Sequence, residues 1–385
     1  MTLEPTEKFE NTTETLQELV KEGYLIDTKN HELFEKYLNK LKNNKKPEIS
    51  KKHWEGKRVL ITGISGMVGS TIADELIDAG AILFGIVRRH AIAYHPYIQK
   101  HMNSGKLKTF EVDLRDYNMT SNVINEVQPH AIFHQAAESF VPTSIDQPAH
   151  VTENNCVSTV NILEATKRYA KEIEGVQLAC SSEQYGFIDN VDEVPVKETH
   201  ELRPTSTYAA TKVFTDYIGR SYYFMYRVPT VITRTFNQEG PRRGLQFFTA
   251  VVASQIAECL NNKKTELIIG NPNSVRDMTH VHESAVAQIM AIEKCNKGEP
   301  YNICSGVGIR MGDYARLAIK TNGLEEKVKL MTDTSRIRPY ERGNVLFDGF
   351  IGDNTKFVEK TGWQPTKSIL DIIKDGVEFY KNIKL

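Results

Sequence analysis

The chain of 385 residues is longer than one ordinary hydrophobic core requires, so we expect two domains or one enlarged α/β unit. Hydrophobic residues make up 40% of it and charged residues 25%, a composition typical of a soluble globular protein. Because 48 basic side chains are balanced by 49 acidic ones, the charge gives no support to nucleic acid or an anionic membrane as the main partner.

Residues 1–57 are charged, poor in glycine and helical in pattern. The segment "HELFEKYLNKLKNN" (31–44) carries apolar residues at helical spacing and predicts an amphipathic helix. A shorter helix is expected from about Thr13 to Glu22, ended by Gly23, and "NNKKPEISKKHWEGK" reads as a basic linker. We expect this extension to pack on its own or a partner subunit, with a regulatory or lid role as the alternative.

The first residues, "MTLEPTEKFE", lack the apolar core of a signal peptide, and no stretch approaches the roughly 18 apolar residues that a membrane span needs. Five scattered cysteines without a CxxC pair favour reduced thiols over a disulfide framework or a metal site. We therefore expect a cytoplasmic protein that holds no metal.

From Arg58 onward, short apolar runs alternate with helical segments. The candidate strands are "RVLIT", "ILFGIV", "LKTFEV", "AIFHQAA", "VQLACSS" and "VPTVITRTFN". The helical segments between them include "GSTIADELIDAG", "SNVINEVQP" and "VSTVNILEATKRYAKEI". Continuously apolar strands favour a buried parallel sheet and hence an α/β fold. We expect residues 58–236 to form this sheet domain. Residues 237–385 are expected to form a smaller domain over its carboxyl edge, partly interleaved with it.

The first candidate strand runs directly into a glycine turn, "TGISGMVG". Glycines at 63, 66 and 69 follow a strand and open a helix, the place of a dinucleotide-binding turn. Backbone amides and the helix N-terminus can take a pyrophosphate there, because absent side chains let the backbone approach it. The predicted cofactor contacts at this turn are Gly63, Ser65, Gly66, Met67, Val68 and Gly69.

The second strand ends "FGIVRRH", which puts Arg88 and Arg89 about twenty residues past the glycines. Folds that bind NAD carry an acid there for the ribose 2′-hydroxyl, so an arginine pair favours a 2′-phosphate and hence NADP. The alternative is a solvated basic loop. At the next strand end, "VDLRD" supplies Asp113 and Leu114 as an expected adenine contact.

The segment "RPTSTYAATKVF" contains Tyr208 and Lys212, four residues apart on a predicted helix and therefore on one face. A lysine ammonium beside a phenol lowers the pKa of the phenol, which predicts Tyr208 as an acid and base near neutral pH. Upstream, "ACSSEQYG" ends an apolar strand and places Ser181, Ser182 and Glu183 at the carboxyl edge of the sheet.

Taken together, these motifs resemble the extended short-chain dehydrogenases/reductases that act on nucleotide sugars. Within that family the similarity is closest to GDP-mannose 4,6-dehydratases and the neighbouring GDP-4-keto-6-deoxymannose reductases. The segments that carry it, in family order, are "TGISGMVG", "GIVRRH", "HQAAESFVPTSIDQP", "SSEQYG", "RPTSTYAATK", "RTFNQEGPRRG", "SVRDMTHV", "YNICSG", "IRPYE" and "TGWQP". The resemblance implies a Rossmann-type, doubly wound NADP-binding domain and a smaller C-terminal domain that binds a sugar nucleotide.

The resemblance also implies roles for particular residues. Tyr208 would deprotonate the sugar 4-hydroxyl, Lys212 would hold the nicotinamide ribose, and Ser181 would hydrogen-bond the 4-oxygen. Glu183 occupies the position of the dehydratase glutamate that removes the C5 proton and helps to expel the C6 hydroxyl. Further contacts are Ala136 and Ala137 for the cofactor, and Ser139, Ser182, Asn237, Arg243, Arg276 and Glu341 for the substrate.

The chain departs from the family pattern at three places. Ser181 replaces the usual Thr, Gln238 replaces the usual His, and "ERGNVLFDGFIGD" is longer than the family's segment. The main prediction is an NADP-dependent nucleotide-sugar 4,6-dehydratase that assembles as a homodimer or homotetramer. A reductase of nucleotide 4-ketosugars, or an epimerase, is the alternative enzyme. An inactive NADP-sensing or scaffold protein is the alternative outside enzymes.

Overall fold

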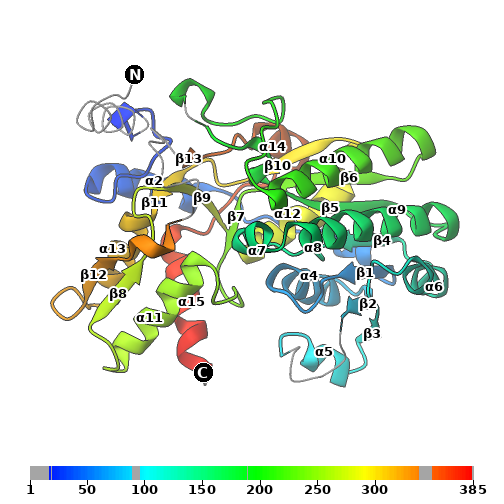
Figure 1. The fold of residues 1–385 in the computed structure, drawn as a ribbon, viewed down its shortest axis with the longest axis horizontal. Helices are drawn as coiled ribbons and strands as arrows, with labels where there is room; N and C mark the ends of the chain where they lie inside the picture. The colour runs from blue at the N-terminus through cyan, green and yellow to red at the C-terminus, as the bar shows by residue number, and fades with distance from the viewer. Residues whose placement is uncertain (1–16, 19, 89–95, 189, 338–348, 384–385) are drawn as a thin grey trace.

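The computed structural model describes residues 17–18, 20–88, 96–188, 190–337 and 349–383. It confirms the α/β fold: a seven-stranded parallel sheet is accompanied by a smaller mixed sheet (Figure 1). The order of the large sheet is β10-β6-β5-β4-β1-β2-β3. Its strands are β1 (Arg58–Thr62), β2 (Ile82–Val87), β3 (Leu107–Glu111), β4 (Ala131–His134), β5 (Gly175–Ser181), β6 (Thr230–Thr235) and β10 (Pro300–Ile303).

This strand order is that of a doubly wound Rossmann sheet. The chain moves outward from β1 to β3 and then returns to β4 on the other side of β1, so the order reverses between β1 and β4. In such sheets ligands bind outside the carboxyl ends of the strands at the point of reversal. The glycine turn follows β1, and Ala136 and Ala137 follow β4, so the fold brings both predicted cofactor segments to this point.

Each predicted strand is present. All are largely buried except β3 at the edge of the sheet, where Lys108 and Glu111 are exposed. The segment "AIFHQAA" is strand only to His134, and "VPTVITRTFN" divides into β6 and the separate β7 (Asn237–Glu239). The seventh strand, β10, pairs with β6 in parallel and was not predicted.

Helices cover both faces of the large sheet (Figure 1). One face carries α6 (Tyr117–Val127), α9 (Ser158–Tyr169) and α10 (Thr207–Tyr226). The other carries α4 (Met67–Asp78), α12 (Val281–Lys294) and α14 (Thr355–Thr361). A parallel sheet buried on both faces explains the continuous apolar strands. The predicted helices over 69–80, 121–129 and 157–173 correspond to α4, α6 and α9.

The smaller part is built around β9 (Val275–His280), which pairs with β7, β11 (Gly308–Arg310) and β13 (Gly349–Phe350). A separate pair is formed by β8 (Glu266–Ile269) and β12 (Lys329–Thr332). The helices of this part are α11 (Phe248–Leu260), α13 (Met311–Thr321) and α15 (Ile369–Asn382). Their apolar faces form one core, to which they contribute Ile256, Tyr314 and Ile372 respectively. After Asn237 the chain contributes to both parts, because β10 is a strand of the large sheet and α12 packs on that sheet.

The N-terminal extension packs on its own chain. The predicted helix is α2 (His31–Asn43), which places Phe34 and Tyr37 against the core of the smaller part. Leu25 bridges Gly308 of β11, and α3 (Lys51–Trp54) ends in Trp54, whose side chain is fully buried under the large sheet. Of the shorter helix predicted over 13–22, residues 13–16 and 19 lie outside the described residues, while residues 17–18 and 20–21 are helical. Gly23 follows at φ +82°.

Candidate active site

The glycine turn brings the backbone of β1 and α4 close to the loop after β4. Gly63 has φ +64°, and a Cβ there would lie 2.8 Å from the amide nitrogen of Ala136. A Cβ on Gly69 would lie 2.4 Å from the carbonyl oxygen of Gly63. At the start of α4, the N-cap Gly66 has no side chain to bond the first amides. These amides are therefore left for an anion, and the cradle fits the pyrophosphate of a dinucleotide.

The "SSEQYG" segment forms a short 3-10 turn, η3 (Ser182–Tyr185), directly after β5. The backbone amide of Glu183 donates to the Ser181 hydroxyl at 3.2 Å. The amide of Ser181 in turn donates to Oε1 of Gln184 at 3.1 Å, which completes a capping box. The turn thus fixes Ser181 and Glu183 at the carboxyl edge of the sheet.

Tyr208 and Lys212 lie on the first turns of α10, whose N-cap Ser206 accepts from the amide of Ala209. Both side chains are buried, and the Lys212 Nζ lies 5.7 Å from the centre of the Tyr208 ring. Nζ donates instead to the carbonyl oxygen of Ala179, at 2.7 Å.

The expectation that Lys212 lowers the pKa of Tyr208 is wrong for this structure. Burial raises the pKa of the Tyr208 phenol, although a hydrogen bond with Ser181 opposes the shift, and the charge of Glu183 raises the pKa further. Burial also lowers the pKa of Lys212. The phenol is therefore held protonated, next to Ser181 and within the field of Glu183.

A cavity of about 560 Å³ joins these three segments. It brings together most of the predicted site residues, namely Gly63, Ser65, Gly66, Met67, Val68, Gly69, Ala136, Ala137, Ser139, Ser181, Ser182, Glu183, Tyr208, Lys212, Asn237 and Arg243. Among the described residues on its wall, Glu183 is the only carboxylate.

Other predicted residues lie elsewhere. Arg88 is exposed at the end of β2 and donates to the side chain of Asn154 at 2.9 Å, while Asp113 is paired with Arg115 at 2.6 Å. Neither of these, nor the buried Leu114, lines the cavity. Arg89 and Glu341 fall outside the described residues.

A second cavity, also of about 560 Å³, adjoins the first. The two share Phe140, Asn237, Arg243, Gln246 and Phe247. Arg276 of β9 lines the second cavity, with its guanidinium 4.9 Å from the Phe350 ring. The predicted substrate residues are therefore distributed over two connected spaces, with Asn237 and Arg243 at the boundary.

Gln238, at the position where the family usually has His, lies in a buried amide network. Its Oε1 accepts from Ser284 at 2.6 Å and from Gln288 at 2.9 Å, and its Nε2 donates to Thr235 at 3.1 Å. Gln288 also accepts from Gln135 at 2.8 Å. Because an amide has no titrating proton, Gln238 shapes the cavity wall and transfers no proton.

Sequence analysis did not single out two further residues beside the site. Asn155 donates to the hydroxyl of Thr211 on α10 and also pairs with both backbone groups of Glu138. It lies in a π-helical turn, η2 (Glu153–Val157), before α9, and such turns frequently mark functional sites. The other is Arg242, which lines the cavity at φ +68°. Neither feature leaves a local sequence signal.

Over the described part of the chain, no group of His, Cys, Asp and Glu side chains is arranged to hold a metal ion. Within those same residues, no helix has both the length and the apolar character needed to cross a membrane.

The sequence model of one protein family, described as "GDP-mannose 4,6 dehydratase", matches residues 60–376. The chain belongs to the GDP-mannose 4,6-dehydratase family. The resemblance drawn from the sequence motifs is thereby confirmed. Similar curated members include GDP-mannose 4,6-dehydratase of Yersinia enterocolitica, 27% identical over 83% of this chain and 93% of its own length. The human GDP-mannose 4,6 dehydratase is 29% identical over 83% of this chain and 90% of its own length.

Solved structures support the fold of this family member. RMD from Pseudomonas aeruginosa, complexed with NADPH, matches 84% of this chain and 99% of its own at a TM-score of 0.71 and 21% identity. DesIV, a dTDP-glucose 4,6-dehydratase from Streptomyces venezuelae with NAD bound, matches 84% of this chain and 97% of its own at a TM-score of 0.71 and 23% identity. At these identities the similarity shows the shared architecture alone.

Proposed function

We propose that this protein is an NADP-dependent nucleotide-sugar 4,6-dehydratase, acting on a substrate like GDP-mannose to give a 4-keto-6-deoxy sugar. The observation that carries the proposal is the single cavity in which Glu183 accompanies Ser181, Tyr208 and Lys212 beside the glycine cradle. Family members are named for this reaction, and the titratable groups on the cavity wall meet its needs.

The first half of the reaction is oxidation at C4. A nicotinamide cofactor held at the glycine turn would supply the redox chemistry, first as an acceptor and then as a donor of hydride. Because burial holds the Tyr208 phenol protonated, the phenol first releases its own proton to the solvent in the cavity. The tyrosinate then accepts the proton of the 4-hydroxyl, and Ser181 holds the same oxygen. Lys212, whose Nζ donates to the carbonyl of Ala179, is assigned to the cofactor ribose, and its positive charge would favour the tyrosinate form of Tyr208.

The second half is elimination of water. A ketone at C4 makes the C5 proton acidic, so a carboxylate can remove it. Glu183 takes that proton and delivers one to the departing C6 hydroxyl, which leaves as water. Once C6 has regained a hydride, C5 takes up a proton from solvent, which offsets the proton lost from the 4-hydroxyl. The overall reaction therefore releases one water and consumes no cofactor.

Substrate binding is assigned to the two connected cavities. Arg243 and Arg276 line the second one, and guanidinium groups suit a diphosphate because they bind its oxygens in pairs. Asn237 lines both cavities and is assigned to the sugar nucleotide near the catalytic groups. Ser139 and Ser182 on the first cavity are proposed sugar contacts. Glu341 retains this proposed role from the family resemblance.

The test is direct. Purified protein is incubated with a panel of GDP-, UDP- and dTDP-sugars in deuterated water, with NADP and without added reductant. A dehydratase gives a product lighter by one water, with deuterium at C5 and no net change in NADPH. A product formed only with added NADPH and without C5 deuterium establishes the reductase instead, and inversion at C4 without loss of water establishes an epimerase.

We expect the Arg88→Ala/Arg89→Ala double variant to weaken NADP binding much more than NAD binding. Each lost bond to the 2′-phosphate costs about 1.5–3 kcal/mol, or roughly 10- to 160-fold in the dissociation constant. Binding of both cofactors is measured by titration calorimetry, with Lys108→Ala on the exposed surface as control. Equal affinity of the wild type for NADP and NAD contradicts the assignment.

A homodimer is proposed from the exposed apolar side chains of α10 and of the turn before α9. Tyr217 is 58% exposed, and Phe214 and Val157 are also exposed. We expect Tyr217→Lys/Phe214→Lys to convert a dimer to a monomer in light scattering at micromolar concentration. A wild type that is already monomeric there contradicts the proposal, as does a variant that stays dimeric while a Lys108→Ala control behaves like wild type.

A further inference from the structure

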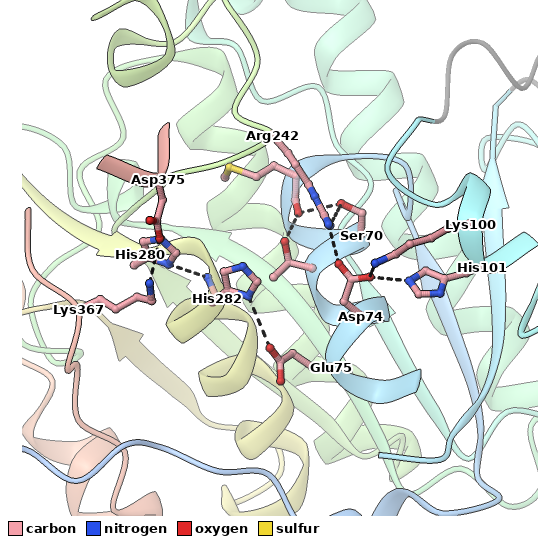
Figure 2. Close-up of polar contacts among 12 residues, drawn as sticks. Ser70, Asp74, Glu75, Lys100, His101, Arg242, His280, His282, Lys367 and Asp375 are labelled. Carbon is pink, nitrogen blue, oxygen red and sulfur yellow. Dashed lines mark hydrogen bonds and ion pairs between the residues drawn. The ribbon is translucent and has the colours of Figure 1, made fainter. Parts of the chain in front are cut away.

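Arg242 lines the proposed cofactor cavity and contacts α4, a helix far from it in sequence. Its backbone lies in the left-handed region at φ +68°, which is unfavourable for a residue other than glycine. From there Nη1 donates to the Ser70 hydroxyl at 3.1 Å and Nη2 to the Asp74 carboxylate at 2.7 Å (Figure 2). Ser70 and Asp74 are one turn apart on α4, directly after the glycine turn. The loop after β7 is thereby tied to the helix that opens the dinucleotide cradle.

The Asp74 carboxylate contacts two further basic side chains besides Arg242. Lys100 Nζ lies 2.9 Å from its carboxylate, and His101 Nε2 lies 2.5 Å away, both from α5 (Gln99–Asn103) (Figure 2). Burial by itself raises the pKa of the Asp74 carboxyl, but hydrogen bonds from His101, Lys100 and Arg242 outweigh burial and lower the pKa. The carboxylate is therefore a fixed negative centre that joins two loops to α4.

Aromatic contacts extend the same assembly. The Arg242 guanidinium lies 5.5 Å from the centre of the Tyr97 ring, and Tyr97 itself lines the cavity. Tyr97 packs on Phe379 of α15 at 5.9 Å, while the neighbouring Tyr380 hydroxyl donates to the carbonyl of Arg243. Four segments far apart in sequence thus meet around one ion pair.

We propose that the Arg242–Asp74 ion pair is a latch that retains the dinucleotide during repeated turnovers. Arg242 and Tyr97 line the same cavity as Gly66 and Gly69, so a dinucleotide bound at the cradle shares that cavity with both side chains. A dinucleotide leaving past this wall requires the pair to part. The inference rests on the proposed function, because a reaction that takes a hydride and gives it back has no need to exchange its cofactor.

The latch is tested by the dissociation rate of NADPH, followed by fluorescence after a chase with excess NADP. We expect Arg242→Met and Asp74→Asn each to raise this rate by about 10- to 100-fold, as loss of a charge-assisted pair predicts. The double variant is expected to release NADPH no faster than the faster single variant, because both changes open one latch. Arg242→Lys, which keeps the charge and one bond, is expected to fall between wild type and Arg242→Met, and it serves if the Met variant does not fold.

The matched control is Lys108→Ala, which breaks an exposed ion pair of the same length, 2.7 Å to Glu126, away from the cavity. Unchanged dissociation rates in folded Arg242 and Asp74 variants overturn the latch and leave the proposed function intact. Additive effects in the double variant also overturn it, since they show two independent contacts. A wild type that binds neither NADPH nor NADH overturns the cofactor assignment itself.

Discussion

The Glu183→Gln variant is expected to oxidise C4 of its nucleotide sugar and then stop. Glutamine keeps the shape of the side chain and the backbone bond to Ser181 but removes the base. Loss of a general base typically costs about 10²–10⁴-fold in rate. Because Glu183 is the only carboxylate among the described residues on the cavity wall, we expect no nearby group to replace it. Tyr208, Lys212 and Ser181 remain, so NADPH and a 4-keto sugar that retains its C6 hydroxyl should accumulate.

Absorbance at the NADPH band and mass spectrometry of the sugar follow this partial reaction. The same variant should fail to incorporate deuterium at C5. In a reductase no proton moves at C5, so NADPH-driven ketone reduction would survive the change and the dehydratase assignment would be lost. Glu193→Gln, the same chemical change at a carboxylate that pairs with Arg203 outside the cavity, is the matched control.

The Asp216→Asn variant is expected to lose about 3–5 kcal/mol of unfolding free energy, the range for breaking a buried pair on one side. Asp216 is fully buried, and Arg234 Nε lies 2.7 Å from its carboxylate. Arg234 also donates to the Tyr185 hydroxyl at 3.1 Å, and Gln184 donates to Asp216 at 3.2 Å. The ion pair therefore contacts two residues of the turn that carries Glu183, and so supports that turn. Removing the negative charge of Asp216 leaves the buried Arg234 guanidinium without a counter-charge.

Urea unfolding measures this loss. Asp216→Leu/Arg234→Met, which removes both charges, should recover much of the stability, because buried pairs are often replaceable by apolar side chains. Glu172→Gln, which breaks the exposed 2.7 Å pair with Arg58, should change stability by about 0–1 kcal/mol. If Asp216→Asn is no more destabilising than Glu172→Gln, the buried pair has no structural importance.

Local sequence was sufficient to predict the elements that have a distinct residue pattern of their own. Most of the six predicted strands are apolar runs, "LKTFEV" being the exception, and the glycine turn is recognisable from the spacing of its three glycines. The strand β10, "PYNI", is only four residues long and begins with proline, so it has no run to recognise. Its place beside β6 is set by tertiary packing.

The candidate site was predictable as a set of residues, but its electrostatics were not. The spacing of Tyr208 and Lys212 gives a shared helix face, yet burial of the phenol is the largest cause of its raised pKa. Lys212 donates to the carbonyl of Ala179, a contact that the spacing does not reveal. Arg242 could not be paired with Asp74 from sequence, because 168 positions separate them. Contacts of this kind exist only once the sheet and the loops around it have formed.

Trp54 shows that a boundary of sequence similarity is not a boundary of folding. The family match begins at residue 60, yet the indole of Trp54 is fully buried, and its Nε1 donates to Glu293 of α12 at 2.5 Å. Losing a buried tryptophan costs about 3–5 kcal/mol, a large share of the stability of an ordinary protein. Fragments trimmed to residues 60–376 lack Trp54 and would leave a cavity under the large sheet. Chimaeras that replace residues 1–57 with the segment of a relative would lose the same contact. Engineered versions of this protein therefore have to keep the N-terminal extension together with the large sheet.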